Sequence, residues 1–113
     1  MEKIVEQGLL YDFYGELLTK HQRKIYEDVV YNDLSLAEIA EENGISRQGV
    51  HDMVRRCNRT LQGYEDKLHL IERFMQVRIN VSRIQELAED LELTREELIT
   101  QIRNLTGQIL EEL

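Results

Sequence analysis

Four arginines in the middle of the chain carry its most distinctive chemistry. Within residues 46–61 they stand against a single acid: Arg47, Arg55, Arg56 and Arg59 against Asp52. That segment has a formal charge of +3, which leaves −11 for the rest of a chain whose net charge is −8. A guanidinium group can bond a phosphate or the edge of a guanine with two hydrogen bonds. A basic segment on an acidic protein is typical of a site that recognises a polyanion.

Helical spacing would give these side chains distinct roles. Ser46 is a helix N-cap by type, so Arg47, Gln48, His51 and Asp52 would point outward from the first turns of the helix that follows. Arg47 suits guanine and Gln48 suits adenine, while Gly49 would let a nucleic-acid backbone come close. Arg55, Arg56 and Arg59 lie farther along and would contact phosphates. The predicted nucleic-acid-binding residues are Ser46, Arg47, Gln48, Gly49, His51, Arg55, Arg56 and Arg59. The alternative is a solvated helix face, which Asp52 favours.

Other chemistry has little support in the sequence. His21, His51, His69 and Cys57 show no paired metal-ligand spacing, so neither a metal site nor another cofactor is expected. Cys57 occupies a core-facing helical position and is expected to be a small buried hydrophobe. No glycine-rich phosphate loop follows a strand. These features predict a protein that is not an enzyme.

The elements that must position the arginines are all expected to be helices. The chain has no proline, and its apolar residues recur at three- and four-residue steps. Helices are predicted over residues 4–17, with an apolar stripe that ends at Leu17, and over 19–31, with Thr19 and Gln22 as a capping box. A third starts after Ser35, with Glu38 as its box partner and Leu36, Ile39 and Ala40 directed inward. The helix after Ser46 turns Val50, Val54, Cys57 and Leu61 inward, and either runs through Gly63 towards Phe74 or kinks at Gly63.

Residues 36–60 fit a helix-turn-helix. The first helix needs a small residue where the second passes close, which Ala40 supplies. The turn needs a residue that tolerates positive φ, which Gly44 supplies. Val50 would point back into the crossing. Many such motifs are purely structural, so the motif alone predicts the fold more firmly than the ligand.

Two further helices are expected in an acidic C-terminal part, over residues 82–91 and from Thr94, with Glu97 as box partner, to about residue 110. The predicted domains are therefore residues 1–75, a helix-turn-helix bundle, and 76–113, a helical pair. Leu68, Ile71, Phe74 and Met75 form an apolar stripe that is either internal core or a dimer face. A homodimer is favoured, because it would present two reading helices.

The chain also repeats itself at an offset of 48 residues. LAEIAEE at 36–42 aligns with IQELAED at 84–90, and Val50 aligns with Leu98. The second copy, over residues 84–104, has Glu96 and Glu97 where the first has Gln48 and Gly49, and these acids would repel phosphate. We therefore expect the second copy to pack or to bind protein. A chance likeness between two amphipathic helix pairs is the alternative.

The bulk properties indicate a cytoplasmic globular protein. The 113 residues suffice for a core, and no apolar run approaches the roughly 20 residues that cross a bilayer. The acidic start does not resemble a signal peptide. One cysteine cannot form an internal disulfide, which suits a reducing compartment.

Two resemblances follow from these motifs. LTKHQR at 18–23, LAEIAE at 36–41, GISRQGV at 44–50 and the arginine pair at 55–56 resemble region four of bacterial sigma factors over residues 17–61, although Gly49 lies where sigma factors often carry threonine. LYDFYGELLT at 10–19, SRQGVHD at 46–52 and LQGYEDKL at 61–68 resemble the YlxM family to about residue 75. That resemblance implies a regulatory protein linked to the signal recognition particle pathway. Two functions stay open: a regulator that binds DNA or RNA through residues 46–59, and a protein-interaction module that binds the particle's GTPase or its RNA.

Overall fold

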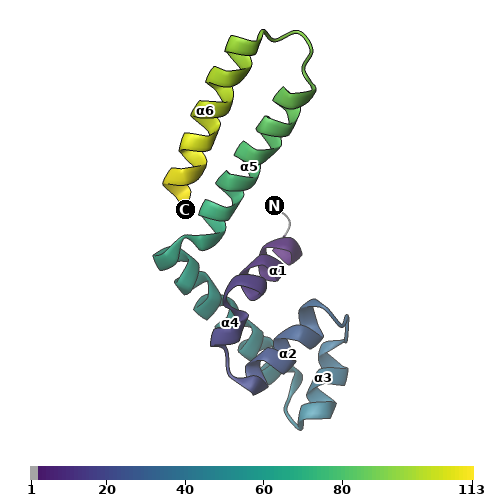
Figure 1. Ribbon diagram of the computed structural model, residues 1–113. Helices are drawn as coiled ribbons and strands as arrows, with labels where there is room; N and C mark the ends of the chain where they lie inside the picture. Colours follow the sequence, from purple (N-terminus) through teal and green to yellow (C-terminus); the bar gives the residue numbers. More distant parts are fainter. Residues whose placement is uncertain (1–2) are drawn as a thin grey trace. The chain divides into compact units, whose positions relative to one another are not determined.

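In the computed structural model, which describes residues 3–113, the chain folds into helices joined by short turns (Figure 1). The elements are α1 (Lys3–Tyr14), the 3-10 helix η1 (Gly15–Leu17), α2 (Lys20–Val30), α3 (Leu36–Asn43), α4 (Arg47–Leu68), α5 (Leu70–Glu89) and α6 (Arg95–Glu112). No strand occurs among the described residues, so the predicted all-α helix-turn-helix fold is confirmed. Each of these helices is too short or too polar to cross a membrane.

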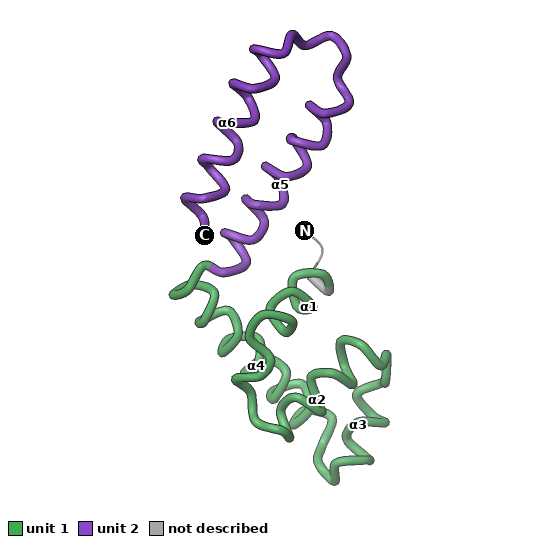
Figure 2. Tube along the Cα trace, viewed as in Figure 1, with its two compact units in different colours: residues 1–69 green, residues 70–113 purple. Residues whose placement is uncertain are grey.

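The chain divides into two compact units, residues 1–69 and 70–113 (Figure 2). The first unit contains the helix-turn-helix, and the second consists of α5 and α6. The sequence analysis placed its domain boundary after residue 75. That position lies inside α5, which begins at Leu70.

Side-chain caps start the helices where the sequence predicted them. Thr19 and Thr94 form complete capping boxes with Gln22 and Glu97, which fixes the first turns of α2 and α6. Ser35 caps α3 by accepting a hydrogen bond from the backbone N–H of Glu38 at 3.1 Å. This bond is half of the predicted box.

The core of the first unit joins α2, α3 and α4. Ile25, Ile39 and Val50 are fully buried in one cluster with Ala40, and Val54 packs against it. Ala40 is therefore the small residue at the helix contact, as predicted. The prediction that Leu36 faces inward is wrong, because its side chain is 38% exposed. Leu34, just before the cap, packs against the cluster instead.

Tyrosine side chains connect α1 to α2 and to the C-terminal end of α2. Tyr11 stacks on Tyr26 with ring centroids 5.5 Å apart and donates a hydrogen bond to Glu27. Tyr31 donates to Asp12 Oδ1 at 3.0 Å and to the Gly8 carbonyl at 3.2 Å. These hydrogen bonds hold α1 against α2 without the help of a disulfide.

The first predicted helix ends earlier than expected. After Tyr14 the chain tightens into η1, so Leu17 leaves the apolar stripe and is 58% exposed. Leu18 is buried in its place. The three-residue turn changes which side of the chain faces the core, and spacing alone did not reveal this change.

The break between the long helices lies at His69. α4 is one continuous helix through Gly63 and ends where His69 adopts the left-handed conformation, with φ of 57°. The predicted stripe is therefore divided, with Leu68 in α4 and Phe74 in α5. The predicted helix start near Ser82 is also wrong, since α5 is continuous to Glu89. The sequence has neither glycine nor proline between residues 70 and 89, so neither residue type breaks the helix near Ser82.

The second copy of the repeat folds differently from the first. α5 and α6 run side by side in opposite directions as a helical hairpin (Figure 1). Gly44 closes the first turn with φ of 65°, but Glu92, at the matching position, is not among the residues of positive φ. The second turn is instead held by Asp90, whose Oδ1 accepts the Glu92 N–H at 2.9 Å. The apolar pattern recurs, but the turn geometry of the helix-turn-helix does not.

Candidate nucleic-acid interface

The turn between α3 and α4 fixes where α4 begins. The N–H of Gly44 donates to carbonyls of the last turn of α3, and the left-handed conformation of Gly44 sends the chain away from that helix. Ser46 then caps α4 by accepting the N–H of Gly49 at 2.9 Å. One residue of unusual backbone and one hydroxyl therefore set the start of the predicted reading helix.

Packing fixes which side of α4 faces outward. Val50, Cys57 and Leu61 are almost completely buried, and they recur at helical spacing along one side of the helix. The predicted inward face is confirmed, with Val54 partly buried beside them. The opposite side must then face away from the core of this unit.

Three of the predicted arginines lie together on that outward side. Residues 52, 55, 56 and 59 follow the i, i+3, i+4, i+7 pattern of one helix face. Arg55, Arg56 and Arg59 are exposed and, with Asp52, line a surface hollow of about 150 Å³. Three guanidinium groups around one hollow favour an anion with several oxygens, such as a phosphate backbone. The acid at its edge partly offsets their charge.

The residues of the first turns lie outside this hollow. Arg47, Gln48 and His51 are exposed and therefore accessible to a ligand. Gln48 is already engaged, since its Nε2 donates to Asp52 Oδ1 at 3.0 Å. His51 Nδ1 lies 3.9 Å from the same oxygen. Asp52 thus holds one predicted reading residue, Gln48, and lies near another, His51. The i, i+4 spacing of Gln48 and Asp52 was the available signal for the first contact.

Ser46 and Gly49 serve the helix start. The N–H of Gly49 is committed to the Ser46 hydroxyl, and Gly49 is half-buried. A Cβ at Gly49 would lie 3.2 Å from Ser46 Oγ, so a larger residue would crowd the cap.

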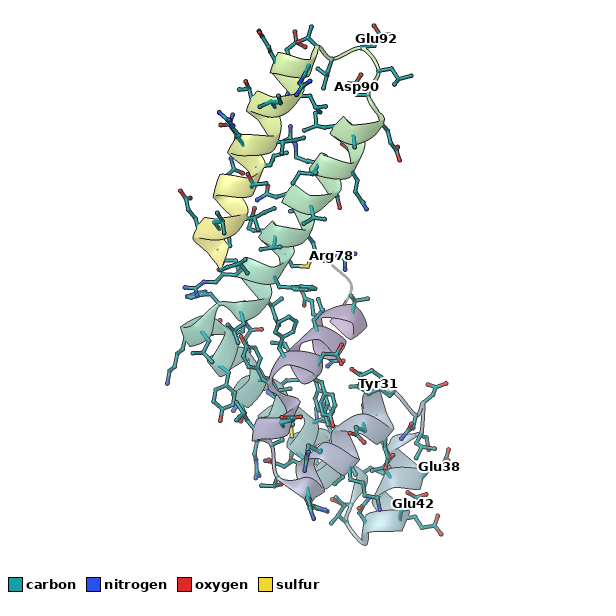
Figure 3. All side chains as sticks on the ribbon, viewed as in Figure 1. Tyr31, Glu38, Glu42, Arg78, Asp90 and Glu92 are labelled. Carbon is teal, nitrogen blue, oxygen red and sulfur yellow. The ribbon has the colours of Figure 1, made fainter. Side chains whose placement is uncertain are left out.

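The first helix of the helix-turn-helix, α3, is acidic on its exposed side. Glu38, Glu41 and Glu42 are all exposed on α3, and Figure 3 shows Glu38 and Glu42 projecting away from that helix. An acidic first helix disfavours phosphate contact there. The exposed side of α3 therefore adds nothing to the surface of α4 that suits a polyanion.

Cys57 and the histidines give no sign of another chemistry. Burial raises the pKa of the Cys57 thiol, which keeps it protonated and a poor nucleophile. Within residues 3–113, His, Cys, Asp and Glu side chains form no group of three that could hold a metal ion.

These observations define an all-helical protein with one helix-turn-helix and a basic outward face on its second helix. Residues 1–105 match the model of the UPF0122 family, which is described as "Putative helix-turn-helix protein, YlxM / p13 like". It belongs to that family.

Relatives of the same family span nearly the same length. A UPF0122 protein of Clostridium kluyveri is 42% identical over 106 residues, which cover 92% of this chain and 95% of the relative. One from Acetivibrio thermocellus is 45% identical over 91 residues, covering 80% and 75%. One from Bacillus thuringiensis is 40% identical over 98 residues, covering 87% and 89%.

Proposed function

We propose that the protein is a non-enzymatic regulator that binds a nucleic-acid duplex through the outward face of α4. The observation that carries this proposal is the joint exposure of Arg55, Arg56 and Arg59 on the face opposite the buried Val50 and Leu61. Duplex DNA is favoured over RNA, because an α-helix fits the major groove of B-form DNA, whereas that of an A-form helix is too narrow.

In this proposal α4 enters the groove with its first turns. Arg47 and Gln48 lie at the base edges, and Gln48 exchanges its bond with Asp52 for one with adenine. Arg55, Arg56 and Arg59 neutralise phosphates, which fixes the register of the helix without specifying a sequence.

The test is fluorescence anisotropy with mixed-sequence DNA and RNA duplexes across a salt series. Arg55→Ala with Arg59→Ala is expected to weaken DNA binding at least about tenfold and to reduce the salt slope by about 2, since each lost phosphate contact removes about 0.9. Lys67→Ala is the matched control, because Lys67 has the same charge and is exposed two turns further along α4. Unchanged affinity in the double variant would contradict the proposal. Tighter binding of the RNA duplex would reassign the ligand.

The cellular setting of this function is a separate proposal. The likeness to the YlxM family supports a role in the signal recognition particle pathway, in the cytoplasm, with the particle's GTPase or its RNA as partner. A pull-down from lysate with and without nuclease distinguishes the partners. Retention of the GTPase after nuclease treatment, and by the Arg55→Ala, Arg59→Ala variant, would support the protein-interaction alternative. Loss of every partner after nuclease would support direct nucleic-acid binding.

A further inference from the structure

Several apolar side chains of the second unit remain exposed after α5 and α6 have packed against each other. α5 and α6 meet along a seam that contains the buried Asn80 and Leu105. Leu87, Leu98 and Ile109 are half-buried along the same seam. Other apolar residues of the hairpin stay exposed, among them Val81 at 44%, Ile99 at 39% and Leu110 at 72%.

These exposed residues follow the seam residues by one position. Val81 follows Asn80 and Ala88 follows Leu87 on α5. On α6 the same relation holds for Ile99, Thr106 and Leu110, which follow Leu98, Leu105 and Ile109. One residue along a helix is a rotation of about 100°. Because the two helices face each other and run in opposite directions, this rotation brings both sets to the same side of the hairpin.

That side is here called the apolar face. Its residues are Val77, Val81, Ile84 and Ala88 of α5 with Ile99, Thr106, Leu110 and Leu113 of α6. On α5 they recur at alternating steps of four and three, the spacing by which helices pack in left-handed bundles. By the same rotation Arg95, the first residue of α6, is a charged residue at one end of this side.

The opposite side of the hairpin is mainly polar. Ile79 and Glu86 on α5 and Glu97, Asn104 and Gln108 on α6 precede the seam residues and lie on this side, together with Gln76, Arg83 and Glu111. The two helices together therefore give the hairpin one apolar side and one polar side. A pair of this kind resembles one half of a four-helix bundle.

We infer that the apolar face binds the apolar face of a second copy of this chain, so that two hairpins form a four-helix bundle. Two acidic proteins repel each other, but a mainly uncharged face, with Arg95 at one end, lets identical copies meet there while burying few charges. The area of the apolar face is also sufficient for a specific dimer interface. Helices of 20 and 18 residues give a face about 27 Å long and about 20 Å wide, or roughly 1,100 Å² for the pair, above the ~1,000 Å² of a specific interface.

The test is sedimentation equilibrium of the full chain, with two apolar-face variants and one control variant. The wild type is expected to be a dimer in the micromolar range. Ile99→Arg and Leu110→Arg each place a charge in the interface and are expected to weaken association at least about tenfold. Asn104→Arg makes the same change on the polar side of α6 and is expected to leave the dimer intact.

Circular dichroism and thermal melting establish that each variant is folded. Leu110 is 72% exposed, so its replacement leaves the hairpin seam untouched and remains informative if Ile99→Arg fails to fold. A monomeric wild type would overturn the inference, and so would a dimer that resists both apolar-face variants. The inference concerns α5 and α6 alone, so it stands or falls independently of nucleic-acid binding by α4.

Discussion

At the scale of single residues, Asp52 is the least expected member of the basic face. It lines the hollow formed by three arginines and accepts a hydrogen bond from Gln48. Its charge opposes phosphate binding, yet its oxygen holds a reading residue in place. Under the proposed function, Asp52 is expected to lower affinity and to restrict how α4 engages a nucleic acid.

Asp52→Asn is expected to tighten duplex DNA binding about threefold to fivefold at low salt, because it removes a negative charge near the phosphates. An asparagine oxygen can still accept the bond from Gln48, so the change isolates the charge. Asp66→Asn is the control, since Asp66 accepts the side chain of Gln62 at 2.9 Å further along α4. Anisotropy titrations check both variants. If wild type and Asp52→Asn bind duplex DNA with equal affinity, the hollow is not part of the DNA-binding surface.

The raised pKa values of three tyrosines predict that the protein loses stability at alkaline pH. Burial, together with hydrogen bonds to Glu27 and Asp12, raises the pKa of Tyr11 and of Tyr31 to about 12. Burial also raises the pKa of Tyr26 well above its usual range. In the unfolded chain these groups lose their protons near pH 10, so the native state binds more protons above that pH, and stability falls as pH rises from about 10 to 12.

Urea unfolding at a series of pH values measures this effect. Tyr26→Phe is expected to lower stability by about 1–2 kcal/mol at neutral pH, since Tyr26 donates to Asn58 Oδ1 at 2.6 Å, and to make the alkaline loss less steep. A free energy of unfolding that is constant up to pH 11 would contradict the assignment.

At the scale of elements, the starts of α2, α3, α4 and α6 and most of the first unit's core were predictable, because caps and apolar spacing are local signals. Thr19, Ser46 and Thr94 cap the helices as their types indicated. The break at His69 was not predictable, since histidine has no strong preference for the left-handed conformation found there. In the candidate site the exposure of the arginines followed from spacing, but the Gln48–Asp52 contact depends on side-chain rotamers that a sequence does not specify.

Two glycines of the first unit should respond in opposite ways to alanine. Gly44→Ala forces a Cβ into a φ of 65° and is expected to cost about 1–2 kcal/mol, whereas Gly63→Ala should stabilise α4 by about 0.5–1 kcal/mol. The Cβ added at Gly63 meets nothing within 4 Å, so only the helix preference changes. Denaturant unfolding measures both. A stabilising Gly44→Ala would contradict the turn geometry.

At the scale of the whole molecule, the two proposals together predict an effect of ligand length. A dimer carries two copies of α4, so a duplex of about 30 base pairs can engage both, whereas one of about 10 engages a single copy. The longer duplex is therefore expected to bind at least about tenfold tighter per site. Ile99→Arg should remove that advantage and leave the affinity for the short duplex unchanged. Equal affinities of the wild type for both lengths would show that the two copies of α4 do not act together.

The burial of Cys57 also has a practical consequence. The only thiol of the sequence is shielded within the first unit and held protonated, so the folded protein should be almost inert to maleimides at neutral pH. A cysteine introduced on an exposed helix position would then carry a fluorophore or spin label with little background. The native chain is thus a ready scaffold for distance measurements.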